Sequence, residues 1–149
     1  MDSEPACASP LILGELYDAA DGPTIMLVMV TLAAGVWLQE AFRSLARLKE
    51  PRTLTPSPEV RVLDVASIQM VCVADGPRIA LRSGDTGDDH SFVWSATVEG
   101  WLYLADLVQP LCDGAAGHQY LTEHKDDAAL IELSSGEPDV LRIAQLNVR

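Results

Sequence analysis

The most apolar stretch of the chain runs from Ile25 to Leu38 and changes its pattern partway along. Its first part, 25–30, is apolar at every position, which is typical of a central strand buried on both faces. From about Leu32 the apolar positions recur at helical spacing and polar residues take the opposite side, as in an amphipathic helix. The pattern therefore predicts a strand that leads directly into a helix, and Pro51 ends this helix because proline cannot continue it.

The same stretch bears on whether the chain enters a membrane. A spanning helix needs about 20 consecutive apolar residues, whereas this run has fourteen and already includes Thr31 and Gly35. A secretory signal needs a basic start close to its apolar segment, and the chain begins with the acidic MDSEP. We therefore expect a buried segment of a soluble domain, no membrane association and a cytoplasmic location.

Alternating apolar and polar positions predict further strands along the rest of the chain. The turn Asp75-Gly76-Pro77 joins two of them into a meander, because such residues favour tight turns. We expect strands at 60–65, 68–74, 79–82, 91–95, 129–133 and 140–146, a short strand or helical turn at 11–17, and a loop or short irregular element at 114–127.

A second helix is expected from about Val98 to Leu111. Thr97 can serve as its N-cap, and Glu99 places a negative charge in the first turn, where it suits the helix dipole. Most sides of this helix are apolar, and only Glu99, Tyr103 and Asp106 mark a polar edge. The helix is therefore expected to be deeply buried.

Together these elements predict an α+β fold, in which a mostly antiparallel sheet carries two main helices packed on one face. A length of 149 residues fits a single domain, with a flexible tail at 1–10 and a proline-rich linker at 51–58. The stretches VTLAAGVWL (30–38) and ATVEGWLYL (96–104) both contain Thr, Gly and Trp-Leu in that order. Either a duplicated strand–helix unit or two helices that begin alike explains this match, and we favour the second.

Cysteine usage and charge narrow the classes of function. Cys7, Cys72 and Cys112 are too few and too scattered for a disulfide framework. The net charge of −12 argues against nucleic acid as a ligand, because phosphates are bound by Lys and Arg. It also argues against binding to anionic membrane surfaces.

The acidic residues are concentrated in the C-terminal half. Twelve of them lie between Gly84 and Val140, and Lys125 is the one lysine or arginine in this segment. Such acidity is compatible with a role in solubility alone. The alternative is a surface that attracts a basic protein.

No motif in the sequence identifies a reaction, a metal site or a cofactor. Phosphate-binding glycine loops, a G-x-S-x-G nucleophile motif and the H-E-x-x-H and C-x-x-C metal patterns do not occur. The acidic loop 84–90 lacks the ligand spacing of a calcium-binding EF-hand. Cys112, His118 and His124 match no standard zinc spacing. We therefore expect no cofactor and no bound metal.

The block FVWSATVEGWLYLADLVQPLCDGAAGHQYL, followed by DDAALIELSSGE, resembles the small acidic immunity proteins of bacterial polymorphic toxin systems. The resemblance covers mainly 92–137 and concerns size, acidity and the order of helix, loop and strand. It implies a compact α+β domain of bacterial origin that is not an enzyme. Such a domain binds a cognate toxin and blocks its active site.

The residues that we expect to bind a basic partner are acids and an aromatic residue of the C-terminal half. Tyrosine and tryptophan are frequent anchors of protein interfaces, and acids around them complement a basic surface. The candidates are Asp85, Asp88, Asp89, Glu99, Tyr103, Asp106, Glu123, Asp126 and Asp127.

Two alternatives from other classes of function stay open. One is a small enzyme or ligand-binding domain that uses a pocket between sheet and helices, with Cys112, His118 or His90, because a Cys/His pair can carry acyl chemistry. The other is an obligate subunit of a larger assembly.

Overall fold

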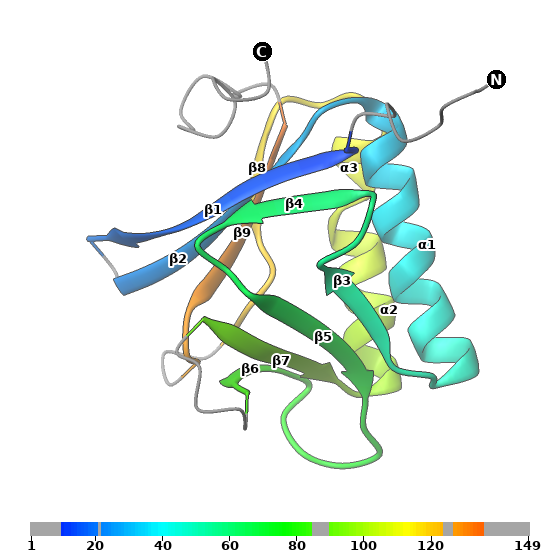
Figure 1. Ribbon diagram of the computed structural model, residues 1–149. Coiled ribbons are helices and arrows are strands. Elements are labelled where there is room, and N and C mark those ends of the chain that lie inside the picture. The colour runs from blue at the N-terminus through cyan, green and yellow to red at the C-terminus, as the bar shows by residue number, and fades with distance from the viewer. Residues whose placement is uncertain (1–9, 21, 85–89, 124–126, 136–149) are drawn as a thin grey trace, which may run out of the picture.

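The computed structural model describes residues 10–20, 22–84, 90–123 and 127–135, and their strands form two mixed sheets (Figure 1). Sheet A has the strand order β4-β1-β2-β9-β8, and sheet B has the order β3-β5-β7-β6. The strands of sheet A are β1 (Ile12–Ala19), β2 (Gly22–Met29), β4 (Val60–Leu63), β8 (Gly117–Tyr120) and β9 (Leu130–Ser135). Those of sheet B are β3 (Arg52–Thr55), β5 (Ser67–Cys72), β6 (Ile79–Ser83) and β7 (Ser91–Ala96).

The α+β class predicted from the sequence is confirmed, although the strands divide between two sheets. Four of the seven strand pairings are antiparallel and three are parallel. The helices are α1 (Leu32–Leu48), α2 (Val98–Leu107) and the short α3 (Gln109–Cys112). No helix in these described ranges is both long and apolar enough to cross a bilayer.

Each sheet combines strands from both halves of the chain. In sheet A the hairpin β1-β2 is joined to β8-β9 by the parallel pairing of β2 with β9. In sheet B the hairpin β6-β7 is joined to β3 and β5 by the parallel pairing of β5 with β7. Both hairpins lead directly into a helix, and Thr31 and Thr97 are the N-caps of α1 and α2. The two helices therefore begin alike, each after a hairpin and an N-cap threonine.

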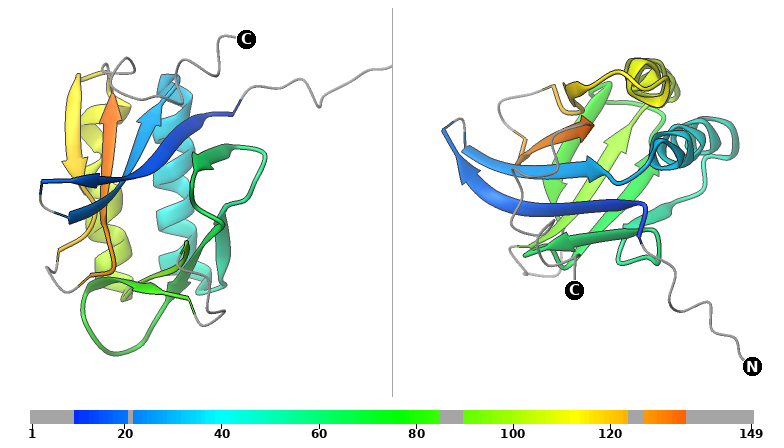
Figure 2. Two further views of the ribbon diagram at one scale, coloured as in Figure 1. Left: turned by 60° about the vertical axis from the view of Figure 1, so that its left-hand side comes forward. Right: turned by 90° about the horizontal axis from the view of Figure 1, so that it is seen from above.

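Helices α1 and α2 lie side by side and run beside both sheets (Figure 2). One core joins them to the inner faces of sheet A and sheet B, so the helices do not simply cover one face of one sheet. At its centre Phe42 of α1, Trp94 of β7 and Trp101 of α2 pack with ring centroids 5.3–5.6 Å apart. Aromatic pairs at this spacing contribute about 0.5–1.5 kcal/mol each beyond their burial.

The face of sheet A that points away from this main core is called its outer face. In β2, Ile25, Leu27 and Met29 point into the main core, and alternation along the strand turns Met26 and Val28 to the outer face. These two side chains form a separate small cluster with Leu13 of β1.

Four local expectations were wrong. The second helix is not deeply buried, because one stripe of it, with Glu99, Leu102, Tyr103 and Asp106, is exposed. The segment expected to be a proline-rich linker contains β3, and the expected loop at 114–127 contains β8. The second helix ends at Leu107 rather than Leu111, because Pro110 has no amide hydrogen to continue the ladder of hydrogen bonds. The strand expected at 140–146 and residues 1–9 of the expected tail lie outside the described residues.

Candidate functional site

One face of α2 carries exposed acidic and apolar side chains side by side. Glu99, Leu102, Tyr103 and Asp106 are all exposed, and their spacing of three and four residues places them on a single stripe. The opposite stripe, with Gly100, Trp101, Leu104 and Ala105, is buried. We call the exposed stripe, together with Arg78 and Glu123, the α2 surface.

Arg78 contacts two of the predicted residues of the α2 surface, Tyr103 and Glu123. Its guanidinium carbon lies 4.1 Å from the ring centroid of Tyr103. Its Nε donates a hydrogen bond to Glu123 at 3.3 Å, and Nη2 forms an ion pair with the same carboxylate. The hydrogen bond to Glu123, with further support from Tyr103 and Glu99, raises the pKa of Arg78. These interactions bring Glu123, Tyr103 and Arg78 together in one cluster.

The backbone of Arg78 is pressed against the first turn of α2. The amide of Thr97 donates to the carbonyl oxygen of Arg78 at 3.1 Å, and a Cβ at position 100 would overlap this same oxygen. Glycine at position 100 therefore allows the turn between β5 and β6 to approach the helix. The hydroxyl of Thr97 also accepts a hydrogen bond from the amide of Gly100 at 3.1 Å, which confirms Thr97 as the predicted N-cap.

A groove adjoins the α2 surface at Glu99, which contributes to both. It has a volume of about 530 Å³. Its lining comes from the end of α1, the segment after β5 and the start of α2, with Lys49, Cys72, Val73, Ala74, Thr97, Val98 and Glu99. A groove beside exposed aromatic and aliphatic side chains is typical of a surface that receives an anchor residue from a partner.

The remaining predicted residues have different positions. Asp106 shares the stripe of Glu99 and Tyr103 on α2. Asp127 is half-buried and accepts a hydrogen bond from the amide of Leu81 in β6 at 3.0 Å, so it has a structural role. Asp85, Asp88, Asp89 and Asp126 lie outside the described residues.

Arg78 was missed by the reasoning from sequence. It precedes the acidic segment and follows the turn Asp75-Gly76-Pro77, so nothing local connects it with α2. A useful signal was available in Gly100, because a glycine in a helix often marks the close approach of another segment.

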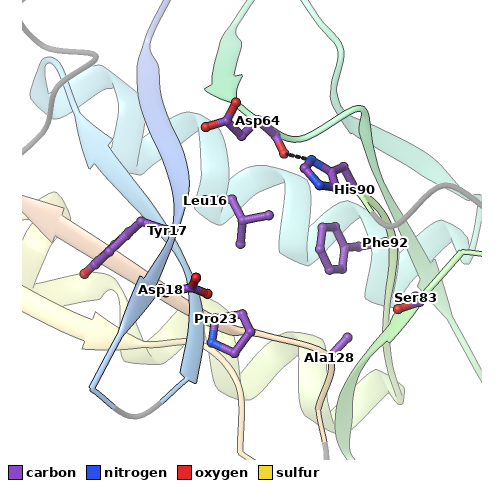
Figure 3. Close-up of a pocket in the computed structure, with 9 residues that line it drawn as sticks. All are labelled: Leu16, Tyr17, Asp18, Pro23, Asp64, Ser83, His90, Phe92 and Ala128. Carbon is purple, nitrogen blue, oxygen red and sulfur yellow. Dashed lines mark hydrogen bonds between the residues drawn. The ribbon is translucent and has the colours of Figure 1, made fainter.

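A second cavity lies between the β1-β2 hairpin of sheet A and the strands β6 and β7 of sheet B (Figure 3). Its volume is about 330 Å³, and Asp18, Asp64 and His90 are among its lining residues. The Nδ1 atom of His90 lies 2.6 Å from the carbonyl oxygen of Asp64. Of the three residues named for the alternative Cys/His pocket, His90 alone lines this cavity.

Cys112 and His118 have separate surroundings. Cys112 of α3 packs against α1, where its sulfur would lie 3.0 Å from a Cβ at Gly35. Burial, with a smaller contribution from Asp113, raises the pKa of its thiol. His118 instead lies on β8, with Nε2 3.8 Å from the carboxylate of Glu132.

A metal site is not apparent in the part of the chain that the structure describes. Within these ranges, no group of three or more histidine, cysteine, aspartate or glutamate residues could hold a metal ion. His124, the third member of the zinc set considered above, and the core of the acidic loop, 85–89, lie outside those ranges.

The chain was compared with protein-family models, with curated proteins and with solved structures. Nothing in any of the three comparisons matches it.

Proposed function

We propose that this protein is a non-enzymatic inhibitor that binds a basic protein through the α2 surface. It resembles an immunity protein that neutralises a cognate bacterial toxin in the cytoplasm. The observation that carries the proposal is the α2 stripe itself, on which Leu102 and Tyr103 are 45% and 38% exposed beside the carboxylates of Glu99 and Asp106.

The composition of this stripe suits recognition of a cationic protein. Tyr103 and Leu102 supply apolar area that is removed from water on binding, and aromatic residues of this kind are frequent hot spots. The acids around them favour a partner rich in lysine and arginine and increase its rate of association. An acidic surface also imitates the anionic substrate of a nuclease, which is one class of toxin that the proposal includes.

Arg78 supports the proposal because it contacts Tyr103, the aromatic residue expected to bind the partner, in the unbound protein. Stacked on Tyr103 and paired with Glu123, it restricts the side chains that a partner meets. A surface that is ordered in advance loses less conformational entropy on association. With one arginine among Glu99, Asp106 and Glu123, the α2 surface still has an excess of negative charge.

Co-expression with the product of the adjacent gene tests the proposal. We expect the two proteins to co-purify at low salt, and Asp106→Arg or Tyr103→Ala to abolish the association. The control is Glu59, which lies between β3 and β4. Glu59→Arg makes the same charge change as Asp106→Arg and is expected to leave binding intact. Association that is equally strong at high salt would contradict the electrostatic part, because exposed charges are screened by salt.

Ligand binding in the cavity of Figure 3 is a second candidate function. The observation that favours it is the presence of Asp18, Asp64 and His90 around one cavity of about 330 Å³, a volume within the range of small-molecule sites. The carboxylate of Asp18 suits a small amine. Titration with 1,4-diaminobutane, followed by amide chemical shifts, is expected to perturb residues of this cavity, and Asp18→Asn is expected to weaken the effect. Shifts spread over the whole protein would contradict a specific site.

A further inference from the structure

The side of helix α1 that faces away from the core is apolar near its start and basic near its end. Leu32 and Val36 are 51% and 50% exposed. Arg43 and Arg47 follow on the same side of the helix, because spacings of four and seven residues return to one stripe. Glu40 is the one acid of α1, and Arg43 donates to its carboxylate at 3.3 Å. We call Leu32, Val36, Arg43 and Arg47 the α1 stripe.

The two long helices are antiparallel, and both sheets pack on the other side of them (Figure 2). Gln39 of α1 reaches Ala105 of α2, and Phe42, further along α1, stacks on Trp101, which comes earlier in α2. The end of α1 therefore lies level with the start of α2. The α1 stripe and the exposed stripe of α2 together form one surface, which we call the two-helix face.

We propose that a second copy of the chain binds to the two-helix face and forms a symmetric dimer. In this dimer α1 of each copy packs on α2 of the other, around a twofold axis parallel to the helices. Such an axis keeps every residue at its own level, so Arg47 of one copy meets Glu99 of the other. Val36 and Leu102 are covered in the same interface. One face then supplies both sides of each contact, as an isologous interface requires.

Charge favours both this occupant and this orientation. Helix α1 has two arginines and one acid, whereas α2 has two acids and no base. Packing α1 on α2 of the second copy brings opposite charges together twice, once on each side of the axis. A twofold axis perpendicular to the helices would instead pack α2 on α2, with Glu99 close to Asp106 of the second copy, where like charges repel.

The size of the two-helix face suits a weak dimer. Helix α1 has 17 residues and is therefore about 25 Å long, and two neighbouring helices are together about 20 Å wide. The face covers about 500 Å² on each copy, or about 1,000 Å² in total, which is near the lower limit of a specific interface. We therefore expect the dimer to dissociate on dilution.

The dimer also bears on the proposed function. A second copy covers Glu99 and Leu102 of the α2 surface, so a basic partner has to displace it before binding. This competition rests on the proposed function, whereas the dimer itself does not.

Sedimentation equilibrium of the full chain tests the dimer. We expect the average mass to rise from that of one chain toward that of two as the concentration increases from micromolar to several hundred micromolar. Arg47→Glu and Glu99→Arg should each stay monomeric, because each places like charges against one another in the symmetric dimer. Arg61→Glu makes the same charge change as Arg47→Glu, but on β4, and should leave the dimer intact.

An equimolar mixture of Arg47→Glu and Glu99→Arg is the decisive sample. Both contacts between the two different variants join opposite charges, so the mixture should form a dimer although neither variant does so alone. A wild-type chain that is monomeric at every concentration, or a mixture that stays monomeric, would overturn the inference.

These measurements separate the dimer from the proposed function, because neither needs a partner protein. A monomeric chain that still co-purifies with the product of the adjacent gene would overturn the dimer alone. A dimer that dissociates as described, without any such co-purification, would support the dimer and count against the proposed function.

Discussion

The side chain of Gln39 on α1 donates a hydrogen bond to the backbone carbonyl of Ala105 on α2, with an Nε2–O distance of 2.7 Å. Ala105 lies in the last turn of α2, where carbonyl groups lack the amide donors of a continuing helix. The same Nε2 donates to the side-chain oxygen of Gln109 at 2.8 Å. A buried polar residue of α1 therefore caps the end of α2 and fixes how the two helices lie together.

Gln39→Leu should lower the free energy of unfolding by about 1–3 kcal/mol, because it leaves the carbonyl of Ala105 buried without a donor. Urea denaturation measures this loss, and the slope of the transition should stay unchanged because the substitution keeps the size of the side chain. Glu40→Leu, next along the helix and exposed, serves as the control. Equal stability of Gln39→Leu and the wild type would show that the hydrogen bond contributes nothing.

Substitution of glycine by alanine should destabilise the protein much more in α2 than in α1. At Gly100 a Cβ would overlap the carbonyl oxygen of Arg78, which is backbone and cannot move aside. Gly100→Ala should therefore destabilise the fold by about 2 kcal/mol, since overpacking outweighs the gain in helix propensity. At Gly35 the nearest atoms are the mobile end of Met29 at 2.9 Å and the sulfur of Cys112 at 3.0 Å.

Gly35→Ala should consequently change stability by less than about 1 kcal/mol, because the propensity gain offsets the repacking. Thermal unfolding of both variants by circular dichroism provides the comparison. Similar losses for the two substitutions would argue against the close approach of the β5–β6 turn to α2.

The elements that could be predicted from sequence are those with a strong local pattern. The continuous apolar run predicted β2, helical spacing predicted α1, and the N-cap Thr97 fixed the start of α2. The two missed strands, β3 and β8, are both edge strands of their sheets. An edge strand has only one bonded neighbour, so its sequence need not be apolar or alternating.

The pairing of strands between the two halves could not be predicted. Thr24 pairs with Leu130 across the parallel contact of β2 and β9, and nothing in either segment specifies the other. Part of the α2 surface was predictable, because Glu99, Tyr103 and Asp106 share one helical stripe. Arg78 was not, because it approaches Tyr103 only when the β5–β6 turn packs on α2.

The two buried tryptophans differ in one hydrogen bond. The Nε1 atom of Trp101 donates to the carbonyl of Val71 at 3.0 Å, whereas Nε1 of Trp94 has no hydrogen-bond partner among the residues that the structure describes. Replacement by phenylalanine removes similar volume at both sites. Trp101→Phe should therefore cost about 1 kcal/mol more than Trp94→Phe, because it alone removes a hydrogen bond.

Urea unfolding followed by far-ultraviolet circular dichroism measures this difference without relying on tryptophan emission. Phe42 contacts both indole rings and is unchanged in each variant. Each substitution therefore alters the packing against the same neighbour. A larger loss for Trp94→Phe than for Trp101→Phe would contradict the assignment of the hydrogen bond.

The ionisation of Tyr17 makes the stability of the folded protein depend on pH. Burial, with added effects of Glu132, Tyr120 and Glu15, raises the pKa of Tyr17 above its ordinary value of 10.0. The folded protein then keeps a proton on Tyr17 that the unfolded chain releases near pH 10. The stabilisation is therefore fully present below pH 10 and is lost as the pH rises through the folded-state pKa.

Glu132→Gln removes the nearby negative charge, and should lower the pKa of Tyr17 without returning it to the ordinary value, because burial is the larger cause. Absorbance at the wavelength of ionised tyrosine, with Tyr17→Phe to identify its signal, follows the titration. Glu40→Gln on α1 is the control and should leave the titration unchanged. A pKa of Tyr17 that is insensitive to Glu132→Gln would show that the two side chains do not interact across the sheet.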